Sequence, residues 1–289
     1  MKNLIKLWTL IFIISSCSIS NIKIETIKPA EINVPNHIES IIIVNRTSPK
    51  KNNKIENIIE GVLSGEMIGV DKKSSEDCIN SLKLEMMNSP RFTLIHTESI
   101  EFKGSGTAAV SSPLKWEKIE KKLNSYEADA LIVLESFDSS SHKKELGIIE
   151  KNRKIKGVWK KIKEHLVSLN IEVQAGWRIY DLKNKKIIDE KRFFDRKIFT
   201  NSDLTPDLAK QKLPSLGYAI SEAAIFAGQQ FYYRISPHYR MITREYFINI
   251  RNIKGFKIKS DNSNDLFIQA SEYVGVQNWE EAIKIWKPL

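Results

Sequence analysis

The feature that most constrains the fold of this chain is a run of alternating apolar and polar residues between positions 167 and 179. A period of two residues is typical of a β-strand with one face buried and the other in water. Residues 181–185 then supply turn formers, and residues 187–199 are expected to return as an antiparallel partner. The apolar positions are Val167, Leu169, Ile171, Val173, Ala175, Trp177 and Ile179. A sheet with a long hairpin is therefore expected at the centre of the fold.

Shorter apolar runs predict further strands at residues 41–44 and 129–134. The second run has no polar alternation, so we expect a strand that is covered on both faces. Helical spacing of apolar residues predicts helices over 55–65, 75–88, 114–125 and 214–235, with a strand at 91–96. Strands separated by helices imply parallel neighbours. The fold class that follows is α+β or α/β, a mixed β-sheet sandwich with packing helices and a long antiparallel hairpin.

The helix at 214–235 carries an apolar stripe that includes Ala223, Ala227 and Phe231. A stripe of this width is typical of a helix that packs on a sheet, so we expect it to be the main core helix. The small residues on the stripe permit a close approach of backbones. The alternative is that the stripe is a contact between copies of the chain.

The N-terminus has the organisation of an export signal. Lys2 and Lys6 form a positive flank, and residues 4–14 form an apolar core. This core is too short to span a bilayer as a permanent helix, which favours a secretory signal. We therefore expect residues 1–16 to be a cleaved signal peptide; an uncleaved anchor is the alternative.

The three residues Ser15-Ser16-Cys17 match the bacterial lipobox, in which small residues precede a lipidated cysteine. We expect a lipid on Cys17 and a lipidated tether over residues 17–36, whereas a plain secretory signal would leave no lipid. No aspartate follows Cys17 directly and no acidic cluster lies behind it. By resemblance to other bacterial lipoproteins, this favours anchoring in the outer membrane with the chain facing the periplasm.

The formal net charge is +10, and its densest source is residues 143–163. An exported protein rarely meets nucleic acid, so we expect no nucleic-acid partner; an anionic lipid or glycan surface suits the charge better. The candidate contacts are Lys154, Lys156, Trp159, Lys160 and Lys161. The alternative is a solvated loop or a hairpin extension.

Cysteine content excludes an internal disulfide if Cys17 is lipidated, because Cys78 is then the single remaining cysteine. The apolar neighbours Ile79 and Leu82 indicate that Cys78 is a small core residue on a helix. A reactive thiol is the alternative interpretation.

Four carboxylates near predicted strand ends are the best candidates for catalysis or metal binding: Glu135, Asp138, Asp181 and Asp189. Strand ends and turns also attract aspartate for backbone reasons. The five histidines show no metal-ligand spacing, and the glycines at 104 and 106 are separated from the next helix by a proline, unlike a dinucleotide-binding turn. We therefore expect no metal, no cofactor and no enzymatic activity.

The last residues of the chain resemble one tetratricopeptide repeat. The pattern of small and aromatic positions is Leu266, Ala270, Tyr273, Trp279, Ala282 and Trp286. The resemblance implies a pair of helices over residues 264–289 with Tyr273, Trp279 and Trp286 as candidate partner-binding residues. A single pair cannot bury its apolar face alone, so it either docks on the α/β domain or belongs to a chain shorter than its relatives.

Three stretches resemble a Bacteroidetes lipoprotein family of unknown function that has an α/β domain and C-terminal tetratricopeptide repeats. They are residues 128–138 (ADALIVLESFD), 176–181 (GWRIYD) and 235–240 (ISPHYR), the last followed by Arg244-Glu245-Tyr246. The resemblance implies a mixed α/β domain at 37–258 and brings no known activity.

The hypothesis that unites these features is a non-enzymatic, lipid-anchored adaptor that binds another envelope protein. The alternative is a metal-dependent envelope hydrolase that uses the strand-end carboxylates. The adaptor predicts an exposed apolar patch around Trp279 and Trp286, whereas the hydrolase predicts that the carboxylates surround a pocket.

Overall fold

The computed structural model describes residues 19–47, 67–95, 100–104, 110–248 and 262–288. The chain divides into two compact units, one formed by Pro29–His238 and the other by Met1–Lys28 with Tyr239–Leu289. Each is described by itself below. Cys17, the helix expected at 55–65 and the loop at 105–109 lie outside the described residues.

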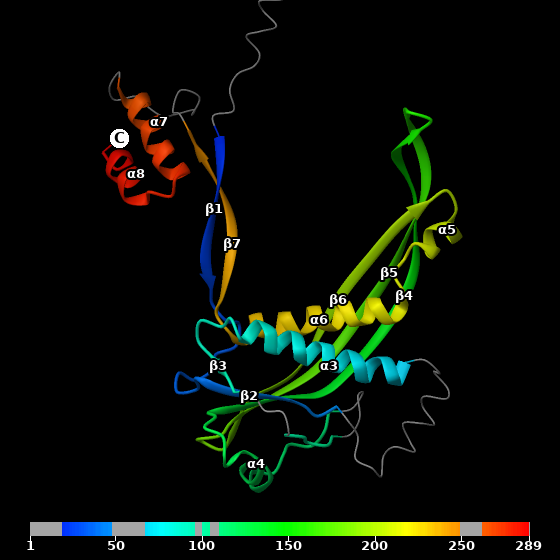
Figure 1. The fold of residues 1–289 in the computed structure, drawn as a ribbon, viewed down its shortest axis with the longest axis vertical. Coiled ribbons are helices and arrows are strands. Elements are labelled where there is room, and N and C mark those ends of the chain that lie inside the picture. Colours follow the sequence, from blue (N-terminus) through cyan, green and yellow to red (C-terminus); the bar gives the residue numbers. More distant parts are fainter. Residues whose placement is uncertain (1–18, 48–66, 96–99, 105–109, 249–261, 289) are drawn as a thin grey trace, which may run out of the picture. The chain divides into compact units, whose positions relative to one another are not determined.

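The larger unit is built on a five-stranded mixed sheet with the order β3-β2-β4-β5-β6 (Figure 1). Its strands are β2 (Ser40–Asn45), β3 (Thr93–Leu94), β4 (Ala130–Ile155), β5 (Val158–Asp181) and β6 (Lys186–Asp203). β2 lies parallel to both β3 and β4, whereas β4, β5 and β6 pair antiparallel. The mixed α+β class expected from the sequence is therefore confirmed.

Two long helices pack side by side on one face of this sheet: α3 (Met67–Met86) and α6 (Leu216–Ile235) (Figure 1). A Cβ atom at Gly228 of α6 would lie 2.2 Å from the Cys78 carbonyl oxygen of α3, so only glycine permits this approach. Beneath them, Trp177 of β5 stacks on Phe231 at 4.1 Å between ring centroids. Cys78 is buried here, and burial raises the pKa of its thiol. It is therefore a core residue, as its neighbours indicated.

The opposite face of the sheet is covered at one end by residues 110–128 and α4 (Trp116–Leu123). Ile42, Leu131 and Val133 pack there against Phe102 and the helix. The start of β4 is thus buried on both faces, as its continuous apolar run predicted. The second face of β5, expected to be wet, is buried at this end because the covering segment encloses it.

Strands β4 and β5 continue far beyond their predicted ends. They pair as far as Ile155 and Val158, and the turn between them places Lys156 and Gly157 at φ of 49° and 84°. β6 stops at Asp203, opposite His165, so the hairpin beyond that point has two strands only. The short helix α5 (Pro206–Gln211) follows β6. The basic stretch therefore forms a hairpin extension and not a loop.

The smaller unit pairs β1 (Ile19–Lys28) with β7 (His238–Phe247) and adds α7 (Ser263–Gly275) and α8 (Trp279–Trp286). β1 occupies half of the segment expected to be a tether, residues 17–36, and its residues alternate between exposed and half-buried as far as Thr26. β7 belongs mainly to this unit, although its residues were assigned to the mixed domain. None of the helices in the described ranges is long and apolar enough to cross a membrane.

One contact between α3 and the sheet is sensitive to pH. The Asp71 carboxylate of α3 is 5% exposed and accepts a hydrogen bond from the Ser139 hydroxyl of β4. Burial raises the pKa of Asp71 to about 6; the Ser139 hydrogen bond opposes the rise and the nearby Asp138 adds to it. The folded protein therefore holds this proton more tightly than the unfolded chain.

The stabilisation from that proton is fully present below the ordinary pKa of 3.8 and is lost as the pH rises through about 6. Asp71→Asn keeps an acceptor for Ser139 and removes the charge. We expect the variant to exceed the wild type in free energy of unfolding by up to about 3 kcal/mol at pH 8, and by little at pH 4. Urea unfolding of both proteins at pH 8 and pH 4 measures the difference in free energy of unfolding. The same difference at both pH values would contradict the prediction. The exposed Asp207→Asn is the control.

Candidate functional site

A buried ion network lies where β4 leaves β2. Glu135 occupies a β-bulge, because the pairing of β4 with β5 shifts between Leu134 and Ser136. Its carboxylate is fully buried and accepts hydrogen bonds from Arg46 Nη1 at 2.9 Å and Arg178 Nη1 at 2.6 Å. Burial raises the pKa of Glu135, and the two guanidinium groups oppose that rise. The network therefore pairs the buried Glu135 carboxyl group with two guanidinium groups.

The same two arginines hold the covering segment against the sheet. Arg46 donates to the carbonyl oxygens of Lys103 at 3.1 Å and Ser112 at 2.8 Å. Arg178 donates to the Ser111 carbonyl at 3.1 Å, and the Tyr180 hydroxyl accepts from the Leu114 amide nitrogen at 2.8 Å. These bonds satisfy backbone groups that no sheet ladder reaches. The ion network therefore positions the wall formed by this segment.

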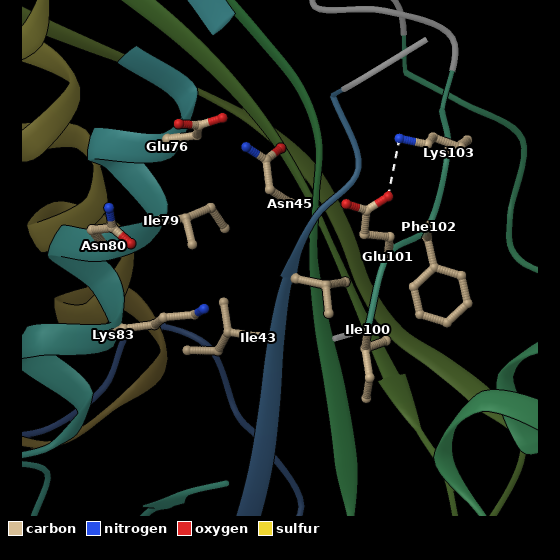
Figure 2. Close-up of a pocket in the computed structure, with 11 residues that line it drawn as sticks. Ile43, Asn45, Glu76, Ile79, Asn80, Lys83, Ile100, Glu101, Phe102 and Lys103 are labelled. Carbon is tan, nitrogen blue, oxygen red and sulfur yellow. Dashed lines mark ion pairs between the residues drawn. The ribbon is translucent and has the colours of Figure 1, made fainter. Parts of the chain in front are cut away.

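A pocket of about 330 Å³ lies between α3 and residues 100–103, where Arg46 binds the Lys103 carbonyl oxygen (Figure 2). Side chains of both charges line it, and Figure 2 shows Lys83 on the α3 side and the Glu101–Lys103 ion pair, at 3.1 Å, on the other. Burial lowers the pKa of Lys83. The lining residues that carry polar groups are Asn45, Glu76, Asn80, Lys83, Glu101 and Lys103. Such a lining suits a small polar ligand and contains none of the predicted carboxylates.

The structure does not bring the four predicted carboxylates together. Glu135 belongs to the ion network, and Asp138 is exposed on β4. Asp181 Oδ2 lies 2.9 Å from His37 Nε2, and the carboxylate also accepts hydrogen bonds from Asn184. Burial favours the neutral form of Asp181, but these contacts outweigh burial and lower its pKa. Asp189 is separate on β6, where burial raises its pKa. No group of three or more His, Cys, Asp or Glu side chains in the described ranges is placed to hold a metal ion.

The other predicted contact residues fall in two places. Lys154, Lys156, Trp159, Lys160 and Lys161 are all exposed near the turn of the β4–β5 hairpin. In the smaller unit, Tyr273 and Trp286 are half-buried, and the Trp286 ring lies 5.5 Å from that of Phe267. Trp279 is the most exposed of the three aromatic candidates.

Sequence reasoning missed Arg46 and Arg178. Each is a charged residue in or directly after an apolar strand, and Glu135 likewise follows the apolar run of β4. A buried charge needs a partner of opposite sign, which is the signal that the sequence contained. Their pairing was not predictable because the three residues lie far apart in the chain and meet only through sheet register.

Removing the central carboxylate tests the structural role of the network. Glu135→Gln leaves two buried guanidinium groups without their counter-charge, so we expect the free energy of unfolding to fall by about 3–5 kcal/mol. The control is Glu190→Gln: its half-exposed carboxylate accepts from Arg178 Nε at 2.9 Å, and the expected loss is about 1 kcal/mol or less. Chemical unfolding followed by circular dichroism gives both values; equal losses would contradict the assignment.

A mixed sheet with two helices on one face and an ion-clamped segment on the other defines this protein as an α+β domain with a small appended unit. The chain belongs to the family described as a domain of unknown function (DUF8603), whose model matches residues 38–247. The match begins just before β2 and ends with β7, so the helical pair α7–α8 lies outside it.

Solved structures give weaker likenesses. A minor lipoprotein from Acinetobacter baumannii is 11% identical, with 68% of this chain and 91% of that chain covered and a TM-score of 0.26. A hypothetical protein from Chlamydia trachomatis is 10% identical, with coverages of 68% and 98% and a TM-score of 0.25. At these TM-scores the likenesses carry no argument about fold or function. A comparison with the curated proteins gives no match.

Proposed function

We propose that the protein is a lipid-anchored, non-enzymatic adaptor of the bacterial envelope that binds another envelope protein through the helical pair α7–α8. The observation that carries this proposal is the exposed apolar surface of α8. Trp279 is 37% exposed and Ile283, one turn further on, is 58% exposed. Neighbouring apolar side chains on one helix face suit a contact with another protein.

In the helical pair, the buried apolar residues are small or medium-sized. The two helices pack against each other, Ala270, Val274 and Ala282 are buried, and the rings of Phe267 and Trp286 lie 5.5 Å apart. Small residues at the helix contact with aromatic residues around them support the likeness to a tetratricopeptide repeat. Repeats of this kind bury their outer faces on neighbours, so one pair leaves a face for a partner.

Two observations support a binding role over the metal-dependent hydrolase. The four carboxylates of that alternative lie apart in the described residues, and Glu135 already pairs with two arginines. The pocket in Figure 2 is lined by a different set of side chains. Exposed apolar side chains at Val276, Trp279 and Ile283, in contrast, support a binding role for α8 and the turn before it.

The place of β1 supports a short link to the membrane. β1 begins at Ile19, two residues after Cys17, and two extended residues span about 7 Å at most. A lipid on Cys17 therefore holds the smaller unit, and with it the helical pair, close to the lipid headgroups. Anchoring in the outer membrane with the chain facing the periplasm is part of the proposal.

Lipidation is tested by metabolic labelling with a palmitate analogue in a bacterial host. The full chain is expected to incorporate the label because Cys17 follows two small residues after an apolar core, and Cys17→Ala is expected to lose it. Cys78→Ala is the matched control, because an acyl donor cannot reach the buried Cys78 thiol. Label retained by Cys17→Ala, or lost equally by Cys78→Ala, would contradict the assignment.

The partner surface is tested by photo-crosslinking in cells. A photoreactive residue at Ile283 is expected to give one reproducible adduct with an envelope protein, because this side chain is exposed next to Trp279. The control position is Met87, an exposed apolar residue after α3 in the larger unit. Trp279→Ser in the same chain is expected to reduce the Ile283 adduct at least about fivefold, since a buried interface tryptophan is a typical hot spot. Equal adducts at Ile283 and Met87 would overturn the proposal.

A further inference from the structure

The end of the β4–β5 hairpin forms a basic arm, defined here as residues 149–164. It begins where the pairing with β6 has ended, and it spans seven residue pairs, or about 24 Å. It carries seven Lys and Arg side chains against two Glu, a net charge of +5, which is half of the +10 of the whole chain. Positive charge is therefore concentrated on a narrow two-stranded projection.

The tip of the basic arm carries apolar side chains on both faces. Ile155 lies opposite Val158, and the next pair, Lys154 and Trp159, points to the other face. Val158 is 59% and Trp159 68% exposed. The turn between the strands needs Gly157, whose φ of 84° disfavours other residues. Large apolar side chains are thus held in water at the end of a defined hairpin.

Several cations behind this tip lack acidic partners. Arg153 donates to Glu164, and Lys161 lies 3.9 Å from Glu150. For Lys154, Lys156, Lys160 and Lys163, no ion pair joins them to any residue in the part of the chain that the structure describes. Three of these ammonium groups, on Lys154, Lys156 and Lys160, therefore lie within two residue pairs of the tryptophan-bearing tip, and Lys163 lies further back on the arm.

We propose that the basic arm inserts its tip into the headgroup region of an anionic phospholipid bilayer. Trp159 suits the boundary between headgroups and acyl chains, and Val158 and Ile155 leave water when the tip enters. The lysines behind the tip are attracted by the negative surface potential, an attraction that salt weakens.

A lipid surface fits this chemistry better than a dissolved polyanion. A nucleic acid or an acidic glycan would satisfy the lysines, yet it would leave Ile155 and Val158 exposed to water. The arm belongs to the larger unit and uses residues distinct from Trp279 and Ile283. This inference therefore extends beyond the proposed partner contact and does not depend on it.

Vesicle binding of residues 17–289 with Cys17→Ser, which lacks the apolar segment before Cys17, tests the arm without the lipid anchor. The vesicles contain either phosphatidylcholine alone or equimolar phosphatidylcholine and phosphatidylglycerol, and co-sedimentation measures binding. We expect binding to the anionic vesicles only, with weaker binding as salt increases. Replacing Lys154, Lys156, Lys160 and Lys161 with Gln is expected to weaken binding at least about tenfold. The matched control replaces the exposed Lys115, Lys121, Lys183 and Lys186, which lie outside the arm, with Gln and is expected to bind like the parent.

A second variant tests insertion rather than surface attraction. Val158→Ser with Trp159→Ser keeps every charge and is expected to bind at least about fivefold more weakly, because the tip loses its apolar side chains. Trp159→Phe is expected to remove the fluorescence quenching that brominated anionic lipids cause in the parent. Thermal unfolding of all variants is expected to match the parent, since the arm lies outside both cores.

Three results would each overturn the proposal: equal losses in the arm and control variants, equal binding to neutral and anionic vesicles, or full binding by the tip variant. Absent vesicle binding together with arm-dependent binding to heparin or to single-stranded DNA would assign the arm to a dissolved polyanion instead. None of these outcomes bears on the crosslink at Ile283, so the two proposals fail separately.

Discussion

The larger unit depends on one buried carboxylate, Glu135, and the two arginines that neutralise it. An ionised carboxylate without partners is too costly to bury, so Arg46 and Arg178 must both reach it once the strands are paired. Each guanidinium has further donors, and these bind the carbonyl oxygens of Lys103, Ser111 and Ser112. One bulge in β4 thus fixes the position of the segment that covers the second face of the sheet.

The sheet is covered on both faces at the end that holds the ion network and on neither face at the other end. Near the ion network, β4 and β5 are covered on one face by α3 and α6 and on the opposite face by α4 and the clamped segment. Further along the same strands, both layers end and the hairpin continues into solvent. A projection of this length without a core of its own needs strong cross-strand pairing or a partner surface to remain ordered. Its charge and its apolar tip favour the partner.

The functional proposals place two contacts on two separate units. The helical pair α7–α8 presents Trp279 and Ile283. In the same unit, β1 begins two positions after Cys17. The basic arm presents Trp159 among lysines that lack acidic partners in the described residues. Protein contact and bilayer contact differ in chemistry: exposed apolar residues suit the first, and lysines around an exposed tryptophan suit the second. The pocket beside Lys83 remains a feature of the fold to which neither proposal assigns a ligand.

The sequence by itself determined the local elements with strong periodicity. Alternation predicted β5, a continuous apolar run predicted the doubly covered start of β4, and an apolar stripe predicted α6. Weaker patterns predicted less, because exposed strands carry little hydrophobic signal. β1 was predicted to be a tether, and the polar half of β4 was predicted to be either a loop or a hairpin extension, of which the structure has the second. Only the tertiary structure decided that Arg46, Glu135 and Arg178 meet, and that the four predicted carboxylates do not. Local periodicity is set by neighbouring residues, whereas the meeting of distant charges is set by strand register and by the cost of burying them unpaired.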